Sequence, residues 1–336
     1  MNPLLFENRS VSGPQGVGSA NFKKFQDLDV TTLTIIAVSN LNININKLFK
    51  YLPVTEYILV QKRRGRKKKT EHRDPNEHIQ NGSIICLQYG SQVRGTVLKK
   101  KSKSKKSKTE KNYFLNSVTV EIVIDKGKMI NIKISSNGKF QITGCKDMNH
   151  VITGLQYLFH HMYYSQKYTG EDIYKMDGPE PKFIFDIVMK NFDFKLKFGI
   201  NRYNLDDFIT NNTDFISLFE DEDKITYVNI KYKLNNYEDE NVTQMTLDYD
   251  NLISHTPFCG FNFTSSTTVP YSEFKKLCVD EKVRRTANKK AKYHTFLVFQ
   301  SGAVIQSGRG PEMEQVYNKF MTTILGNKEK FIEITE

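Results

Sequence analysis

The chain has 336 residues, a formal charge of +12 at pH 7, 38% hydrophobic residues and no tryptophan. This length allows one large core or two ordinary ones. No apolar run approaches the roughly 18 residues that a membrane helix needs, and residues 1–16 lack the charged start and apolar stretch of a signal peptide. We therefore expect a soluble protein that stays inside a cell and has no membrane partner. Its four cysteines are scattered without CxxC spacing and are expected to be free thiols.

Two segments hold most of the positive charge. Residues 62–69 carry seven cations, and residues 99–111 carry eight cations and one acid, so the rest of the chain has a formal charge of −2. Such like-charge runs suit phosphate backbones or nuclear import, and they are often interaction tails. The alternative is that both are solvated insertions without a partner.

The first half is predicted to run strand, helix, several antiparallel strands, helix. Residues 1–28 show no sustained period and are expected to form a loose arm. β-branched residues favour a strand, turn residues mark a hairpin, and apolar residues at helical spacing mark a helix. The expected elements are a strand at 32–45, a helix at 46–52, a strand at 83–90, a hairpin at 116–136 turning at 125–128, a strand at 139–144 and a helix at 147–162.

The second half repeats that order. The expected elements are a strand at 183–200, a helix at 205–219, a strand at 225–234, a hairpin at 293–308 and a helix at 311–325. An insertion at about 235–293 is too long for an unstructured loop in a compact domain, so we expect it to fold or to bind something.

Glycines at one hairpin corner recur after a fixed interval. Gly138 and Gly144 correspond to Gly302 and Gly308, both after a shift of 164 residues. Two related halves are therefore predicted, with an α+β fold in which helices cover one face of a mainly antiparallel sheet. The other face would form a long curved surface with approximate two-fold symmetry.

These corners resemble the TATA-box-binding protein family, whose two repeats each end a hairpin with Phe, SGK, two or three apolar residues, TGAK and a helix. Here "SSNGKFQITGCK" matches the first copy and "FQSGAVIQSG" the second. The stretches "TIIAVSNLNININKLF" and "FDIVMKNFDFKLKFGINRYNL" resemble the first strands of the two repeats. The resemblance implies a saddle with helices on its convex face, a first repeat at 29–165 with basic insertions at about 62–80 and 99–111, and a second repeat at 166–336. The basic insertions and the abundance of Asn resemble the divergent versions of large DNA viruses.

The resemblance also implies minor-groove binding, in which apolar wedges unstack base steps and kink the duplex. Phe299 takes the place of an intercalating phenylalanine in the second repeat, and the corresponding position in the first is Ser135. Phe114, Ile134 and Phe140 are nearby apolar residues that could substitute for it.

The family's groove-reading asparagines correspond to Thr34 and Met189, and Ile36 and Asn191 share their face because strand side chains alternate. Further matches contribute phosphate-contacting or groove-facing positions. They are Lys139, Thr143 and Lys146 in the first copy, Ala303, Ser307 and Gly310 at the same places in the second, Ile305 on the second groove face, and Arg309 as a replacement cation.

Each of these positions has a structural alternative. Phe299 could belong to the core, the glycines could serve turn geometry alone, and Lys139 and Lys146 could be ordinary surface lysines. His255, Cys259, Cys278 and His294 match no standard zinc finger, so no metal or other cofactor is expected. No P-loop, GxSxG or HExxH motif occurs, and the pair at 160–161 is not expected to be catalytic, so no enzyme and no small-molecule substrate are expected.

The resemblance therefore predicts a transcription initiation factor that binds and bends A/T-rich promoter DNA and recruits transcription factors and RNA polymerase. Its location would be the host nucleus or a viral factory in the cytoplasm, with packaging in the virion as a further option. One alternative is a scaffold of the same fold that has lost DNA reading, which Ser135 and Met189 favour. Another is a general polyanion binder acting through its lysine-rich loops, with binding indifferent to sequence and steeply salt-dependent.

Overall fold

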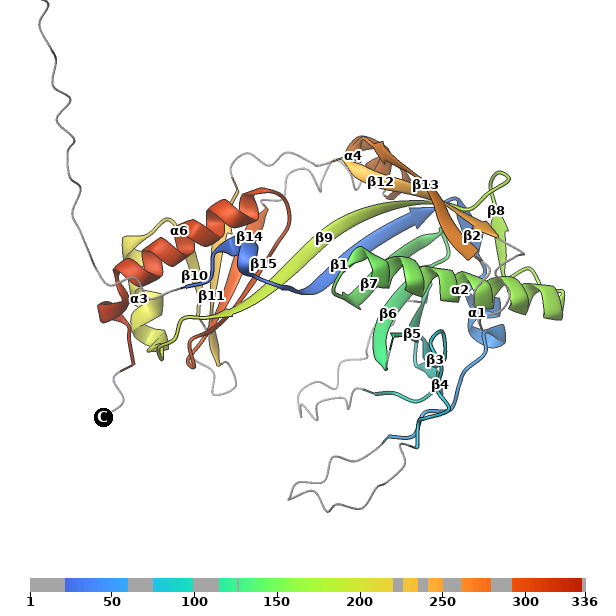
Figure 1. Ribbon diagram of the computed structural model, residues 1–336, viewed down its shortest axis with the longest axis horizontal. Coiled ribbons are helices and arrows are strands. Elements are labelled where there is room, and N and C mark those ends of the chain that lie inside the picture. Colours follow the sequence, from blue (N-terminus) through green and yellow to red (C-terminus); the bar gives the residue numbers. More distant parts are fainter. Residues whose placement is uncertain are drawn as a thin grey trace, which may run out of the picture.

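The computed structural model describes residues 22–59, 75–98, 115–125, 127–219, 226–234, 241–249, 261–278 and 292–333 (Figure 1). Both basic segments, 62–69 and 99–111, lie outside these ranges, so their contact with a polyanion stays a prediction. Among the helices of the described ranges, none combines the length and the apolar character that crossing a bilayer requires.

The first half contains a helix after its first strand and a second helix after its last, as predicted. Its elements are η1 (Phe25–Asp27), β1 (Val30–Ser39), β2 (Leu41–Ile43), α1 (Ile45–Tyr51), β3 (Ile84–Tyr89), β4 (Gln92–Gly95), β5 (Ser117–Asp125), β6 (Lys128–Ser135), β7 (Lys139–Cys145) and α2 (Met148–Thr169). The short strand β8 (Tyr174–Met176) leads into the second half and pairs with β2.

The second half repeats this order, with one insertion between its third and fourth strands. Its elements are β9 (Lys182–Lys195), α3 (Arg202–Asn212), β10 (Ile216–Leu218), β11 (Tyr227–Lys233), the insertion β12 (Val242–Tyr249), β13 (Phe261–Val269) and α4 (Tyr271–Cys278), then β14 (Tyr293–Phe299), β15 (Ala303–Gly308), α6 (Glu312–Gly326) and η3 (Lys328–Lys330).

Thirteen strands form one sheet in which the two halves meet at their first strands. The order is β10-β11-β14-β15-β9-β1-β7-β6-β5-β3-β4, with β1 and β9 antiparallel at the centre. Outward from this pair, each half continues with its last strand and that strand's hairpin partner, followed by β11 and β10 in the second half and by β5, β3 and β4 in the first. The sheet therefore has the approximate two-fold arrangement that the sequence repeat predicts. Figure 1 shows the long strands β9 and β1 running between the two halves.

Two hydrophobic cores lie under the helices. The first joins β1, β3, β5, β6 and β7 to α1 and α2, and the second joins β9, β11, β14 and β15 to α3 and α6. Phe296 and Phe320 stack in the second core with centroids 4.0 Å apart. Each of the first three helices begins with a side-chain cap, since Asn44, Asp147 and Asn201 accept hydrogen bonds from backbone N–H groups three residues later.

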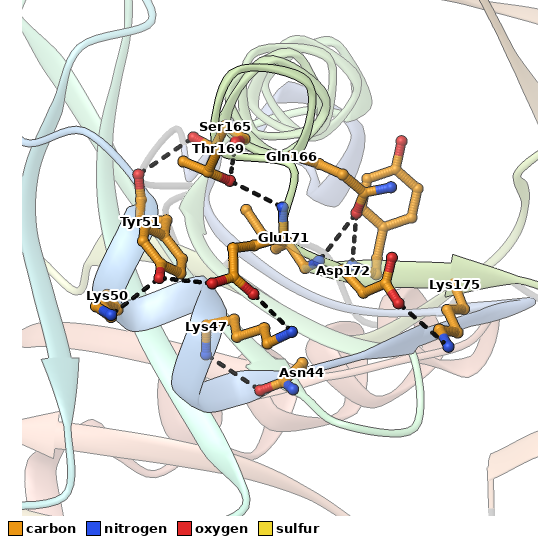
Figure 2. Close-up of polar contacts among 12 residues, drawn as sticks. Asn44, Lys47, Lys50, Tyr51, Ser165, Gln166, Thr169, Glu171, Asp172 and Lys175 are labelled. Atoms are coloured by element: carbon orange, nitrogen blue, oxygen red, sulfur yellow. Dashed lines mark hydrogen bonds and ion pairs between the residues drawn. The ribbon is translucent and has the colours of Figure 1, made fainter.

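The connection between the halves is fixed to the first half by polar contacts (Figure 2). Gln166 Oε1 accepts hydrogen bonds from the backbone N–H groups of Ile173 and Tyr174 at 2.9 and 3.0 Å. The Glu171 carboxylate pairs with Lys47 Nζ at 2.9 Å and accepts a hydrogen bond from the Tyr51 hydroxyl at 3.0 Å. These contacts hold the end of α2 against α1 before the chain enters β9.

The predicted helix at 205–219 is wrong in its second half. α3 ends at Asn212, and Ile216–Leu218 form the edge strand β10. Thr213 has extended backbone angles, and its Oγ1 accepts a hydrogen bond from the Phe215 N–H, so the helix stops and a strand begins.

The predicted strand at 32–45 is also shorter than expected and bends at Asn40. The Asn40 side chain donates to the Asp177 and Glu180 carbonyls and accepts from the Lys182 N–H. This clamp turns β2 away from the main sheet and towards β8.

Residues 22–28, assigned to a loose arm, pack against the second half. The Phe25 ring lies 4.9 Å from Phe192 and 5.5 Å from Tyr317 between centroids, and the Tyr317 hydroxyl donates to the Lys23 carbonyl. Residues 1–21 lie outside the described ranges.

Candidate nucleic-acid interface

One face of the sheet carries none of the helices α1, α2, α3 and α6. Along β1, Leu33, Ile35 and Ala37 are buried in the first core, so the alternating side chains of Thr34 and Ile36 point to the opposite face. We call this opposite face the open face. Residues paired across antiparallel strands share a face, so the register assigns the other candidates.

The centre of the open face is the pair Thr34 and Met189. These two residues stand directly opposite each other in the β1–β9 ladder, and Thr143 of β7 is the other neighbour of Thr34. The positions matched to the family's two asparagines are therefore related by the approximate two-fold axis. Thr34 is 8% exposed and Met189 is half-buried, so the centre offers a hydroxyl and a thioether.

A second row crosses the other half. Asn191 of β9 pairs with Ser307 of β15, which pairs with Thr295 of β14. The Asn191 Oδ1 atom is buried and has no hydrogen-bond partner within the described residues. Buried polar atoms are normally hydrogen-bonded. The structure thus brings Thr34, Thr143, Met189, Asn191 and Ser307 together on one surface.

Phe299 lies at the end of the second hairpin and on the open face. It opens a tight turn in which its carbonyl accepts from the Gly302 N–H at 2.9 Å, while Phe296 and Val298 point into the core. The Phe299 ring is half-buried and meets Tyr227 with centroids 5.6 Å apart. The two rings form an aromatic pair at one end of the open face.

Sequence reasoning missed Tyr227. It lies directly opposite Phe299 in the β11–β14 ladder, so the signal that could have found it is the register of the predicted strand at 225–234 against the hairpin. Half-buried Leu297 and Ile305 pair with each other on the same face. Together with Met189, Tyr227 and Phe299, they form what we call the apolar strip.

The first half has the same turn without the aromatic residues. Ser135 opens a turn closed by the Gly138 N–H at 3.2 Å, and the residue opposite Ser135 in β5 is Ser117. Ile134 and Phe140 are buried in the first core and cannot substitute as wedges. Phe114 lies outside the described residues. The two ends of the open face are therefore chemically different.

The matched lysines lie at the first-half edge. Lys139 pairs with Val38 at the start of β7 and is half-buried, while Lys146 is exposed just before the α2 cap. Of the corresponding second-half residues, Ala303 offers no cation, and Gly310 lies in the turn before α6.

Arg309, predicted to replace the missing cation, contacts two other side chains of the protein. Its Nη1 lies 3.0 Å from the Asp186 carboxylate, and its guanidinium stacks on the Tyr271 ring at 5.1 Å. In this structure Arg309 thus contacts protein groups, and its contact with phosphate stays a prediction.

Of the four residues considered as zinc ligands in the sequence, His294 has a described side chain. His294 is fully buried under the start of α6 beside Gly308, whose added Cβ would lie 2.0 Å from the ring. His255, Cys259 and the Cys278 side chain lie outside the described part, within which no group of three His, Cys, Asp or Glu side chains could hold a metal. Burial raises the pKa values of the Cys86 and Cys145 thiols to about 11 and about 12, which keeps them protonated.

No protein-family model matches the sequence. A protein of Acanthamoeba polyphaga mimivirus named TATA-box-binding protein-like is 25% identical over 215 residues, which are 61% of this chain and 52% of that protein. The chain is similar to this viral TATA-box-binding protein-like protein. A relative in Invertebrate iridescent virus 6, named uncharacterized protein 335L, is 29% identical over 231 residues, 65% of this chain and 62% of its own length.

The chain thus spans about half to three fifths of the length of these two relatives. A solved structure titled Methanococcus jannaschii TBP aligns over 89% of this chain and 98% of its own length, with a TM-score of 0.39 and 12% identity.

Proposed function

We propose that this chain binds double-stranded, A/T-rich promoter DNA on the open face, bends it and recruits transcription machinery. The observation that carries the proposal is the apolar strip ending in Tyr227 and Phe299 on the sheet face opposite α1, α2, α3 and α6. Apolar side chains at a protein surface need a partner that can accept them. The TATA-box-binding protein-like name of the mimivirus relative supports the same proposal.

An A/T preference follows from the chemistry of the minor groove. A·T pairs present only acceptor atoms there, whereas guanine adds an amino group that obstructs close apolar approach. The thioether of Met189 and the side chain of Ile305 tolerate the floor of an A·T groove but not a protruding amino group. Thr34, Asn191 and Ser307 would supply the hydrogen bonds to acceptors.

The kink is expected at one end of the site. Tyr227 and Phe299 can wedge between base pairs, whereas Ser117 and Ser135 offer no apolar surface. Bending costs free energy that the added contact must offset. A single aromatic end would produce a smaller bend than two such ends.

The helical face is proposed to carry the protein partners. α3 and α6 border a groove of about 1010 Å³ lined by Asn211, Thr213, Thr322, Thr323 and Asn327, among others. We further propose a first repeat at 29–165 and a second at 166–336. A viral origin, with activity in a host nucleus or a cytoplasmic factory, is proposed because both relatives are viral.

The second candidate function is a scaffold of this fold that binds DNA weakly or without sequence preference through its lysine-rich loops. Ser135, Ser117 and the engaged Arg309 favour it, because each removes a DNA contact that the first proposal would use.

The experiment is fluorescence energy transfer between the ends of a TATA-containing duplex and a G/C-rich duplex, titrated with the full chain at several salt concentrations. A second protein has the cations of 62–69 and 99–111 replaced by serine. Selective binding of the A/T duplex with a change in end-to-end transfer, retained by the second protein, would support the open face. Binding without selectivity that disappears with the cations would support the scaffold.

A further inference from the structure

The inserted helix α4 lies on the open face. It follows β13 after Pro270, and Phe274 of α4 is buried against Val38, Ile184 and Val242. Val38 and Ile184 pair across β1 and β9 on the side opposite the first core. Figure 1 draws α4 on the other side of β9 and β1 from α2.

The inserted residues first extend the main sheet by two strands and then reach the open face. β12 pairs with the first residues of β9, Lys182 to Phe185, and β13 pairs with β12. Leu247 and Phe261 anchor the pair in the first core, where the Phe261 and Phe159 rings lie 4.9 Å apart. The hairpin is therefore fixed, and α4 is the part that reaches over the open face.

A second contact holds α4 in place from the sheet side. Arg309 follows β15, pairs with Asp186 of β9 at 3.0 Å, and presents its guanidinium to the Tyr271 ring at 5.1 Å. Asp186 is 4% exposed and is the partner of Ile36 in the β1–β9 ladder. Val38 and Ile36 thus lie on the part of the open face against which α4 packs, which we call the seat of α4.

This seat coincides with the proposed DNA site. Ile36 and Arg309 are both predicted to face the DNA groove. Ile36 packs against the cluster that contains Phe274, and the Arg309 guanidinium lies over the Tyr271 ring. A duplex cannot reach Ile36 while α4 is docked. Release of α4 would at the same time free the Arg309 guanidinium from the Tyr271 ring.

We propose that α4 is a lid that competes with DNA for the open face, so that the structure represents a closed state. The proposal rests on the proposed function. Its anchor is small, since Phe274 is the buried apolar residue among the described side chains of α4, while Ser272, Glu273 and Lys276 are exposed. A binding-competent state that is populated only in part weakens the apparent affinity by that fraction, and opening the lid removes the loss.

The alternative is that α4 helps to bind DNA, because Lys275 and Lys276 add positive charge beside the site. In that case, undocking α4 weakens binding instead of strengthening it. The sign of the effect therefore separates the two.

The experiment uses the absence of tryptophan from the chain. Tyr271→Trp places a single emitter in the seat of α4, where it keeps an aromatic ring for Arg309. Phe274→Ala in this background should shift the emission to that of a solvated indole without any DNA. Lys276→Ala, on an exposed position of the same helix, is the matched control and should leave the emission unchanged.

The same three proteins are then titrated with the TATA-containing duplex. The lid predicts that Phe274→Ala lowers the Kd several-fold, that Lys276→Ala changes it little, and that DNA shifts the emission of the Tyr271→Trp protein towards the solvated value. Weaker binding of both variants would overturn the lid and assign α4 to the interface.

Identical emission with and without Phe274 would show that α4 is not docked and would also overturn the proposal. If no protein binds DNA although the emission shift of Phe274→Ala is present, the proposed function fails and the lid is refuted as a DNA gate, while the docking itself is confirmed. Binding by Phe274→Ala alone would support both proposals.

Discussion

Tyr227 and Phe299 stand directly opposite each other in the β11–β14 ladder, with ring centroids 5.6 Å apart. At the same place in the other half, Ser117 stands opposite Ser135. Both pairs end at a turn of the same geometry, closed by Gly302 in one half and Gly138 in the other. The backbone symmetry of the sheet is thus kept while the side chains at its two ends differ.

This asymmetry predicts that the bend depends on one end only. Phe299→Ala and Tyr227→Ala should each reduce the change in end-to-end energy transfer on a TATA-containing duplex, because the wedge loses one of its two rings. Ser135→Ala and Ser117→Ala are the matched controls and should leave the bend as it is. An equal loss from the serine and the aromatic variants would contradict a wedge at Phe299.

A test of specificity is available at the centre of the face. Met189→Asn would place an amide opposite Thr34, where it can donate to the acceptors of an A·T pair. We expect the ratio of A/T to G/C affinity to rise, measured by competition at constant salt, with Lys133→Asn as a control elsewhere on the open face. No change in this ratio would show that position 189 does not take part in base recognition.

The two hairpin glycines supply a prediction about stability. Gly302 has φ = +74°, and an added Cβ would lie 2.1 Å from the Phe198 carbonyl oxygen. Gly127 also has a positive φ, +79°, but no atom of the described residues lies within 4 Å of its added Cβ. Gly127→Ala should cost about 1–2 kcal/mol of unfolding free energy from backbone strain alone, and Gly302→Ala should cost clearly more. Equal losses of unfolding free energy, measured by urea denaturation, would show that the backbone near Phe198 moves away from the added Cβ at little cost.

The repeated fold could be predicted because its signals are local. Hairpin turns, helical spacing and the recurring glycines each occupy a few consecutive residues, and the order of elements follows from them. The prediction at 205–219 failed because apolar residues of a short edge strand directly follow those of α3, and spacing alone cannot separate the two. β10 becomes a strand through its pairing with β11, which is a non-local contact.

The site was predictable only in part. Thr34, Thr143 and Met189 could be matched one by one, but their adjacency depends on the register of three strands. Tyr227 was missed because no motif marks it. The contacts of Arg309 could not be predicted because Asp186 and Tyr271 come from a strand and an insertion that are distant from it in sequence.

The stacked pair in the second core predicts a large loss of stability on truncation. Phe296 is fully buried and lies parallel to Phe320 at a centroid distance of 4.0 Å. Phe296→Ala should lower the unfolding free energy by about 3–5 kcal/mol. Tyr293→Ala, on the same strand but exposed, is the control and should cost much less. The measurement is urea denaturation followed by circular dichroism.

Buried histidines predict that stability falls with acidity. Burial lowers the pKa values of His294 and His161, and the nearby Glu312 carboxylate and the Gly82 carbonyl oppose it only in part. Burial and the neighbouring His161 lower the pKa of His160 to about 4. In the unfolded chain these side chains titrate near about 6.5. Below that pH the unfolded state binds more protons than the folded state, so stability is present above about 6.5 and is lost as the pH falls towards 4.

His294 is the residue at which this dependence can be tested, because neither of its ring nitrogens has a hydrogen-bond partner within the described part of the chain. His294→Phe keeps a planar ring in the space beside Gly308 and removes the titrating group. The difference in unfolding free energy between pH 7.5 and pH 5 should be smaller in this variant than in the natural protein. An unchanged difference would mean that the buried ring accepts its proton in the folded state as readily as in the unfolded one.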